Sequence, residues 1–166
     1  MKTWMLLLFI TFPLYAFSPI SDVYSKEAYQ EQWKEILKQK QKREYVEVIM
    51  KTISWAESGG NYNAMGASGD HGKYQILKST WRGWCKIYFG KQLEMTPENQ
   101  DSLVNVVISD WVEKGLTVEQ IAAKWNSGSH VGWKTKVGIN KYGVPYDVPK
   151  YVENFVHQYK IIKTNT

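Results

Sequence analysis

The chain is poor in the residues that build covalent cross-links and metal centres. Cys85 is its one cysteine among 166 residues, which excludes an internal disulfide and a cysteine-based zinc cluster. Its histidines, His71, His130 and His157, are scattered and form no His-x-x-x-His pair. Glycine-rich phosphate-binding motifs and a Gly-x-Ser-x-Gly elbow are also missing. We therefore expect no metal and no cofactor, and we expect Cys85 to be a core residue.

The chain also lacks an apolar run of membrane-spanning length. The run from Trp4 to Phe12 is shorter than the roughly 18 apolar residues that a spanning helix needs. It follows the basic Lys2 and precedes the small Ala16, which is the pattern of a secretory signal peptide. We interpret residues 1–16 as a signal peptide cleaved after Ala16, with an uncleaved N-terminal anchor as the alternative. The protein is then exported to the periplasm or the cell envelope, and a membrane is a partner only through an uncleaved segment.

Positive charge and aromatic residues are abundant. The net charge is +5, which favours anionic partners, and the chain has eight Trp and 11 Tyr residues. Acidic residues interrupt the basic segment from Lys26 to Arg43, which favours a solvated helix face over nucleic-acid binding. In an exported protein, the positive charge suits a cell wall whose peptides carry carboxylates.

Apolar spacing predicts a mainly helical protein with an N-terminal arm and one domain. Residues 17–44 form the predicted arm, whose apolar residues fall on one helix face: Tyr29, Trp33, Ile36 and Leu37. Residues 45–166 form the predicted domain. Its first helix ends at Gly59-Gly60, because glycine readily adopts the left-handed conformation at a helix end.

Further start and stop signals divide the domain. Residues 73–77 are predicted as a short strand, and Ser79 as the cap of the next helix. Thr96-Pro97 and the capping box from Thr117 to Gln120 begin two later helices, the second ending at Gly128. Residues 132–149 are predicted as a long loop before the last helix. On these helices, the apolar stripes predict that Trp81, Trp84 and Trp111 are core residues.

Glu57 stands where a carboxylate is disfavoured. It lies at the predicted end of an apolar helix, where the negative end of the helix dipole and apolar neighbours both raise a carboxyl pKa. A carboxyl group that keeps its proton near neutral pH suits a general acid for glycosidic-bond cleavage. Asp70, in a glycine-rich loop, is a second carboxylate that a hairpin would bring across from Glu57. The alternatives are an exposed Glu57 at a helix end and an Asp70 that only forms a turn.

Four short motifs in this order resemble the signature blocks of lytic transglycosylases and goose-type lysozymes. The resemblance covers roughly residues 45–159. The motifs are Glu57-Ser58-Gly59-Gly60, Gly72-Lys73-Tyr74-Gln75-Ile76, Ala123-Lys124-Trp125-Asn126-Ser127-Gly128 and Pro149-Lys150-Tyr151-Val152.

This resemblance implies a mainly α, lysozyme-like α+β fold with a short β-hairpin beside a cleft that binds peptidoglycan glycan strands. It implies that Glu57 acts as the acid and then as the base, closing a 1,6-anhydro ring without water. Ser58 would hydrogen-bond the reacting sugar, Gln75 would line the cleft, and Asn126 would position an N-acetyl group or the catalytic carboxylate. Tyr151 would stand close to Glu57.

The chain departs from the family pattern at three positions. Lys73 and Tyr74 stand where the family usually has small or apolar residues, and Trp125 stands where it usually has tyrosine. We expect these departures to affect sugar-binding subsites, with Tyr74 and Trp125 among the substrate-binding residues. The aromatic residues expected to wall the cleft and stack on sugars are Trp125, Trp133, Tyr142 and Tyr146.

Two other functions remain open. The loop and strand around Asp70 also resemble those that carry the second carboxylate of animal lysozymes, so Asp70 is a candidate substrate-binding or catalytic residue of a hydrolytic muramidase. A non-catalytic peptidoglycan-binding module of an envelope assembly is the alternative from another class. By family habit, an envelope-spanning secretion or conjugation machine is a candidate partner.

Overall fold

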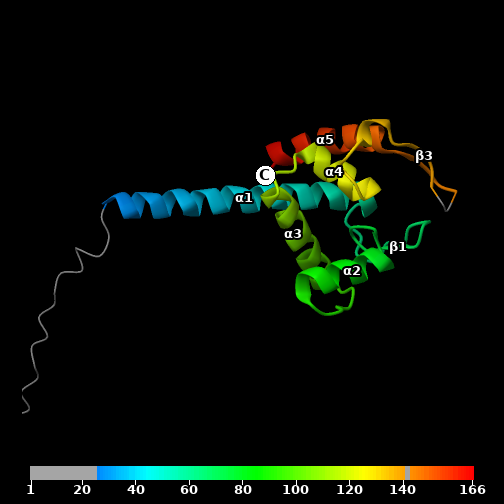
Figure 1. The fold of residues 1–166 in the computed structure, drawn as a ribbon, viewed down its shortest axis with the longest axis horizontal. Helices are drawn as coiled ribbons and strands as arrows, with labels where there is room; N and C mark the ends of the chain where they lie inside the picture. The colour runs from blue at the N-terminus through cyan, green and yellow to red at the C-terminus, as the bar shows by residue number, and fades with distance from the viewer. Residues whose placement is uncertain (1–25, 141–142) are drawn as a thin grey trace, which may run out of the picture. The chain divides into compact units, whose positions relative to one another are not determined.

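The computed structural model describes residues 26–140 and 143–166, and these residues are mainly helical, as predicted. The predicted signal peptide and the first part of the predicted arm lie outside the described residues. By its internal contacts the chain divides between Lys38 and Gln39, inside the predicted arm, into a smaller N-terminal and a larger C-terminal unit. The elements, in chain order (Figure 1), are α1 (Lys26–Ser58), β1 (Asp70–His71), β2 (Ile76–Leu77), α2 (Lys78–Phe89), α3 (Pro97–Glu113), α4 (Val118–Ser127), the 3-10 helix η2 (Trp133–Thr135), β3 (Val137–Ile139), β4 (Pro145–Asp147) and α5 (Val148–Thr164).

The described part of the N-terminal unit belongs to α1. Residues 26–38 are exposed, including the four apolar residues of the predicted face. Tyr29 and Trp33 contact each other edge to face, with ring centroids 6.0 Å apart. None of the described helices is both long enough and apolar enough to cross a membrane.

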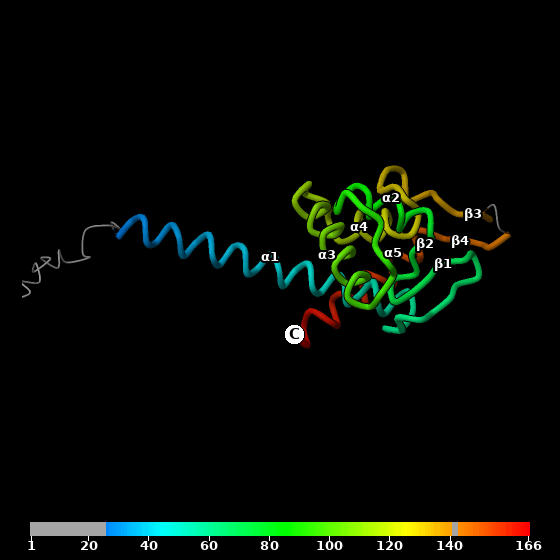
Figure 2. Tube along the Cα trace, turned by 90° about the horizontal axis from the view of Figure 1, so that it is seen from below, coloured from blue at the N-terminus to red at the C-terminus, as the bar shows by residue number. Residues whose placement is uncertain are grey.

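The core of the larger unit forms around the later part of α1. That part runs between α3 and the pair α4 and α5 in Figure 1. Ile49 and Ile53 of α1 are fully buried, in one apolar cluster with residues from every other α-helix. Cys85 and Trp111 are buried in this cluster, as predicted. Both hairpins lie at the same end of the unit, as Figures 1 and 2 agree.

Capping residues define the ends of α3 and α4. The Thr96 hydroxyl accepts a hydrogen bond from the backbone N–H of Asn99, and Thr117 and Gln120 form the predicted capping box. Gly128 ends α4 with φ of 75°. The prediction that Ser79 caps the next helix is wrong, because α2 begins at Lys78 and no side chain caps its start.

The first hairpin is antiparallel and pairs Asp70 with Leu77. The predicted strand 73–77 shrinks to Ile76–Leu77. The reason is that Gly72 and Gln75, with φ of 80° and 48°, bend the intervening residues into turns.

The prediction of a long loop at 132–149 is wrong. This segment contains η2 and a second antiparallel hairpin, in which Gly138 faces Tyr146. Its strands are short and contain glycine and proline, which are depleted in strands, so their sequence signal is weak. Asn140 stabilises the turn: its side-chain oxygen accepts a hydrogen bond of 3.0 Å from the backbone N–H of Val144.

Candidate active site

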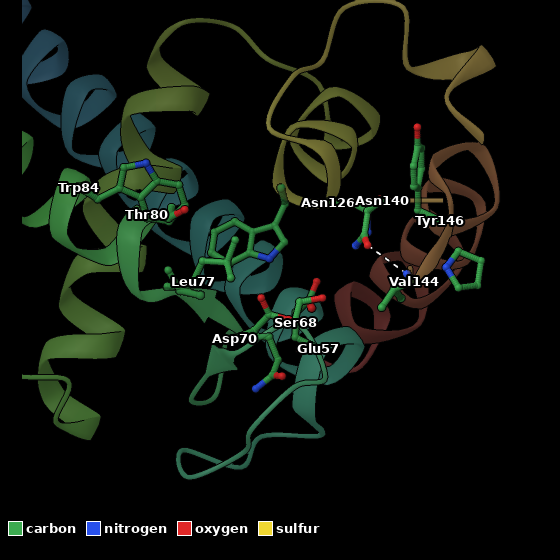
Figure 3. Close-up of a pocket in the computed structure, with 14 residues that line it drawn as sticks. Glu57, Ser68, Asp70, Leu77, Thr80, Trp84, Asn126, Asn140, Val144 and Tyr146 are labelled. Atoms are coloured by element: carbon green, nitrogen blue, oxygen red, sulfur yellow. Dashed lines mark hydrogen bonds between the residues drawn. The ribbon is translucent and has the colours of Figure 1, made fainter. Parts of the chain in front are cut away.

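A cavity of about 330 Å³ opens at the C-terminal end of α1. We call it the Glu57 cavity. Four parts of the chain line it: the end of α1, the first hairpin with the start of α2, the end of α4, and the second hairpin (Figure 3). The lining residues are Glu57, Ser68, Asp70, Gln75, Ile76, Leu77, Thr80, Trp84, Trp125, Asn126, Asn140, Val144, Pro145 and Tyr146.

Glu57 lies in the last turn of α1 with hydrogen-bond donors around its carboxyl group. The Tyr151 hydroxyl donates to Oε1 of Glu57 at 2.6 Å. The indole N–H of Trp125 donates to the same carboxyl group. Both donors come from other helices, so the packing of α4 and α5 against α1 fixes the position of the carboxyl group.

Burial raises the pKa of Glu57 from 4.5 to about 7. Desolvation is the largest cause, and the nearby charge of Asp70 raises the pKa further. The hydrogen bonds from Tyr151 and Trp125 lower it but do not outweigh burial. Glu57 therefore exchanges its proton close to neutral pH, which is the behaviour that general acid–base catalysis requires.

The Tyr151 hydroxyl keeps its proton and so remains the hydrogen-bond donor to Glu57. Burial and, next, the neighbouring Glu57 carboxylate hold the pKa of the Tyr151 hydroxyl well above its usual value. Tyr151 lies in the first turn of α5, where the Asp147 side chain caps the helix by accepting the backbone N–H of Lys150. Tyr151 thus acts on Glu57 and does not itself line the cavity.

Asp70 and Gln75 come together over a glycine. A Cβ atom placed on Gly66 would lie 2.5 Å from Oε1 of Gln75 and 2.8 Å from Oδ2 of Asp70, so only glycine leaves room for both side chains. Gln75 also donates from Nε2 to the carbonyl of Gly72 at 2.9 Å. Burial raises the pKa of Asp70 as well, although less than that of Glu57.

Three predicted substrate-binding residues are absent from the cavity wall: Tyr151, Ser58 and Tyr74. Ser58 donates its hydroxyl to the carbonyl of Lys73 at 2.7 Å, which ties the end of α1 to the turn of the first hairpin. Tyr74 is only 1% exposed, so the expectation that it contacts substrate is wrong. Its ring packs edge-on against Trp125, and it therefore supports a wall residue from behind.

A partly buried polar cluster explains both departures in the first hairpin. The carboxylate of Asp101, on α3, accepts hydrogen bonds from Tyr62, Lys73 and Tyr74 at 2.6, 2.9 and 2.7 Å. We call these four residues the Asp101 cluster. Burial opposes ionisation of Asp101, but the donors outweigh it and hold its pKa below the usual value. The cluster ties the first hairpin to α3.

Gln100 adds a second tie. It is 2% exposed, and its Oε1 accepts the backbone N–H of Lys73 at 2.8 Å. Its Nε2 donates to the carbonyls of Tyr62 and Met95. The turn that carries Gln75 is therefore also held by Gln100 of α3.

The structure brings Glu57, Asp70, Gln75, Trp125 and Asn126 to one cavity, as predicted. Sequence reasoning missed the contributions of α2 and of most of the second hairpin. Of the aromatic residues expected to wall the cleft, Trp125 and Tyr146 line the Glu57 cavity. Trp133 lines a different hollow beside α5. Tyr142 lies outside the described residues.

Trp84 was predicted as a core residue but lines the Glu57 cavity. It belongs to the predicted apolar stripe of α2 and contacts Trp111 and Trp125 edge-on or tilted, at 6.1 and 5.6 Å. It is only partly buried, however, and also lines the cavity. A periodic stripe identifies the inward face of a helix but does not separate core from cavity wall.

Searches with protein-family models, among curated proteins and among solved structures found no match to this chain. Within residues 26–140 and 143–166, no group of three His, Cys, Asp or Glu side chains is arranged to hold a metal ion. The chemistry of the cavity therefore has to be inferred from its own side chains.

Proposed function

We propose that the protein is an exported lytic transglycosylase that cleaves the β-1,4 bond between N-acetylmuramic acid and N-acetylglucosamine in peptidoglycan. One observation carries the proposal: Glu57 lines a cavity, has a pKa of about 7 and accepts a hydrogen bond from Tyr151. Such a carboxyl group can give up a proton and take it back at neutral pH. The family-like motifs support the proposal, because Glu57, Gln75 and Asn126 line the same cavity.

In the proposed reaction, Glu57 first donates its proton to the glycosidic oxygen, and the bond from that oxygen to C1 of N-acetylmuramic acid breaks. The oxygen of the 6-hydroxyl group of the same sugar then bonds to C1, while the Glu57 carboxylate takes the hydroxyl proton. The product is a 1,6-anhydro sugar, Glu57 is protonated again, and no water is consumed. Tyr151 and Trp125 donate hydrogen bonds that steady the carboxylate between the two steps.

Hydrolysis by a muramidase is the second candidate, and Asp70 favours it. Asp70 lines the same cavity, and its charge acts on Glu57 strongly enough to raise its pKa. Glycosidases that use water pair a protonated carboxyl group with an ionised one, as lysozyme does. Here Glu57 would be the acid and Asp70 the ionised partner.

Digestion of purified peptidoglycan tests the proposal. Mass spectrometry of the soluble fragments should find 1,6-anhydro ends, whereas reducing ends would indicate hydrolysis. Glu57→Gln should abolish digestion, and Glu94→Gln, the same change at an exposed position, should not. Binding to intact cell walls without any soluble fragment would instead support the non-catalytic binding module.

Export and partners belong to the same proposal. The predicted signal peptide, residues 1–16, would deliver the enzyme to the periplasm or the cell envelope. There it would open the wall locally for an envelope-spanning secretion or conjugation machine. N-terminal sequencing of the protein recovered from the envelope tests the cleavage after Ala16.

A further inference from the structure

The second hairpin forms one end of the Glu57 cavity. Asn140, Val144 and Tyr146 line it from this hairpin, and Leu77 of β2 lines it together with Thr80 and Trp84 of α2. Figure 3 shows these two groups on opposite sides of the view, with Glu57 and Asp70 between them. A polymer cleaved at Glu57 needs contacts on both sides of the broken bond, and the hairpin supplies one of these sides.

Tyr146 rests on a position that has no side chain. Gly138 is its partner across the hairpin. A Cβ atom on Gly138 would lie 3.1 Å from the Tyr146 hydroxyl oxygen and 3.3 Å from Cζ, which is closer than ordinary packing. The tyrosine ring therefore lies against the backbone of the opposite strand.

The backbone at Gly138 does not itself require glycine. Nine glycines of the described residues have positive φ, and Gly138 is not among them. Turns and helix ends account for those nine, whereas at Gly138 the close approach of Tyr146 is the feature that disfavours a side chain, because the ring would have to shift to make room for it. The neighbouring Val137 and Ile139 point away from the ring and are 62% and 72% exposed.

The position of Tyr146 suits the face of a sugar ring. Tyr146 is 38% exposed although the backbone supports its ring, so part of an immobilised aromatic surface is open to a ligand at the cavity. A rigid aromatic side chain gives large contact area at small cost in conformational entropy. Asn126, an amide that can donate and accept hydrogen bonds, lines the same cavity.

We propose that Tyr146, supported by Gly138, is the stacking platform of a sugar-binding subsite that lies to one side of the bond cleaved at Glu57. Its ligand is an uncharged N-acetylated hexose of the glycan strand. The identity of this ligand rests on the proposed function, but the platform itself rests on the contact between Tyr146 and Gly138.

Binding measured without cleavage tests the subsite. In the full chain carrying Glu57→Gln, we would titrate peptide-free glycan strands, prepared from peptidoglycan with an amidase, by calorimetry. Adding Tyr146→Ala should weaken binding about tenfold, because an aromatic anchor is lost, while Tyr146→Phe should stay within about twofold. Gly138→Ala, which keeps the tyrosine but pushes its ring, should fall between them. Tyr29→Ala removes an exposed tyrosine of the arm and should leave binding unchanged.

The outcomes separate the subsite from the proposed function. Circular dichroism and thermal melting of each variant establish that the fold is kept. If Tyr146→Ala does not fold, the binding measured with Gly138→Ala tests the subsite in its place. If folded Tyr146→Ala binds as tightly as its parent, the subsite is refuted, whereas digestion by the native protein would still uphold the proposed function. A native protein that digests peptidoglycan while the Glu57→Gln parent binds no strand also refutes the subsite. The proposed function fails if the native protein releases no fragments, if the fragments carry reducing ends, or if Glu57→Gln still digests peptidoglycan.

Discussion

Glu57 should make the folded protein less stable as the pH rises, and Glu57→Gln should remove this effect. The pKa of Glu57 rises from 4.5 to about 7 on folding. A tenfold change in proton affinity corresponds to about 1.4 kcal/mol, so ionising Glu57 costs about 3 kcal/mol more in the folded protein than in the unfolded chain. Between pH 4.5 and 7 the unfolded chain has lost this proton while the folded protein still holds it, and stability therefore falls as the pH rises through this range.

The glutamine variant should not show this fall, because an amide does not titrate. We expect its free energy of unfolding, relative to the native protein, to increase by about 3 kcal/mol between pH 4.5 and pH 8. Its amide oxygen can still accept the hydrogen bond from Tyr151, but the amide has one acceptor oxygen where the carboxylate has two. Any effect of the substitution on these hydrogen bonds shifts the free energy of unfolding by the same amount at every pH. The test is therefore how the difference in free energy of unfolding between variant and native protein changes with pH.

Urea unfolding at constant ionic strength, followed by circular dichroism at half-unit steps of pH, measures this difference. Glu94→Gln provides the matched control at the surface. A difference between Glu57→Gln and the native protein that stays constant from pH 4.5 to 8 would show that Glu57 has an ordinary pKa. It would also remove the main support for its role as an acid near neutral pH.

Further expectations concern the cavity. The kcat/KM for peptidoglycan should fall as the pH rises through about 7, because Glu57 must hold its proton to act as an acid. Tyr151→Phe should move this fall in kcat/KM to higher pH, because it removes a hydrogen bond that lowers the pKa of Glu57. A pH profile that does not move would contradict the assignment of the fall to Glu57. Asp70→Asn should move it to lower pH, because a charge that raises the pKa is lost. Gly66→Ala should reduce kcat/KM about tenfold or more by displacing Gln75, and an active, folded variant would count against the packing described.

The sequence allowed prediction where the signal is local. Thr96 and Thr117 mark helix starts because their hydroxyl groups bond to backbone N–H groups only three residues away. Gly128 marks the end of α4 by its own backbone conformation. Glu57 could be singled out because the helix end and its apolar neighbours are contiguous in the chain.

The parts that could not be predicted depend on residues distant in sequence. The buried Tyr74 donates a hydrogen bond from its hydroxyl to Asp101, 27 positions later, and a single sequence does not show this pairing. The second hairpin was missed for another reason. Its strands have three residues each, too few for alternation to stand out, and the contact that identifies Tyr146 as a wall residue comes from Gly138 on the other strand.

The bond between Glu57 and Tyr151 joins residues that are 94 positions apart. A growing polypeptide that has not reached Tyr151 already contains the carboxyl group, but lacks the phenol that holds it. Ribosomal synthesis thus supplies the carboxyl group of Glu57 first and, 94 residues later, the hydroxyl group of Tyr151. Until α5 has been synthesised, the Glu57 carboxyl group therefore lacks the hydrogen bond from Tyr151.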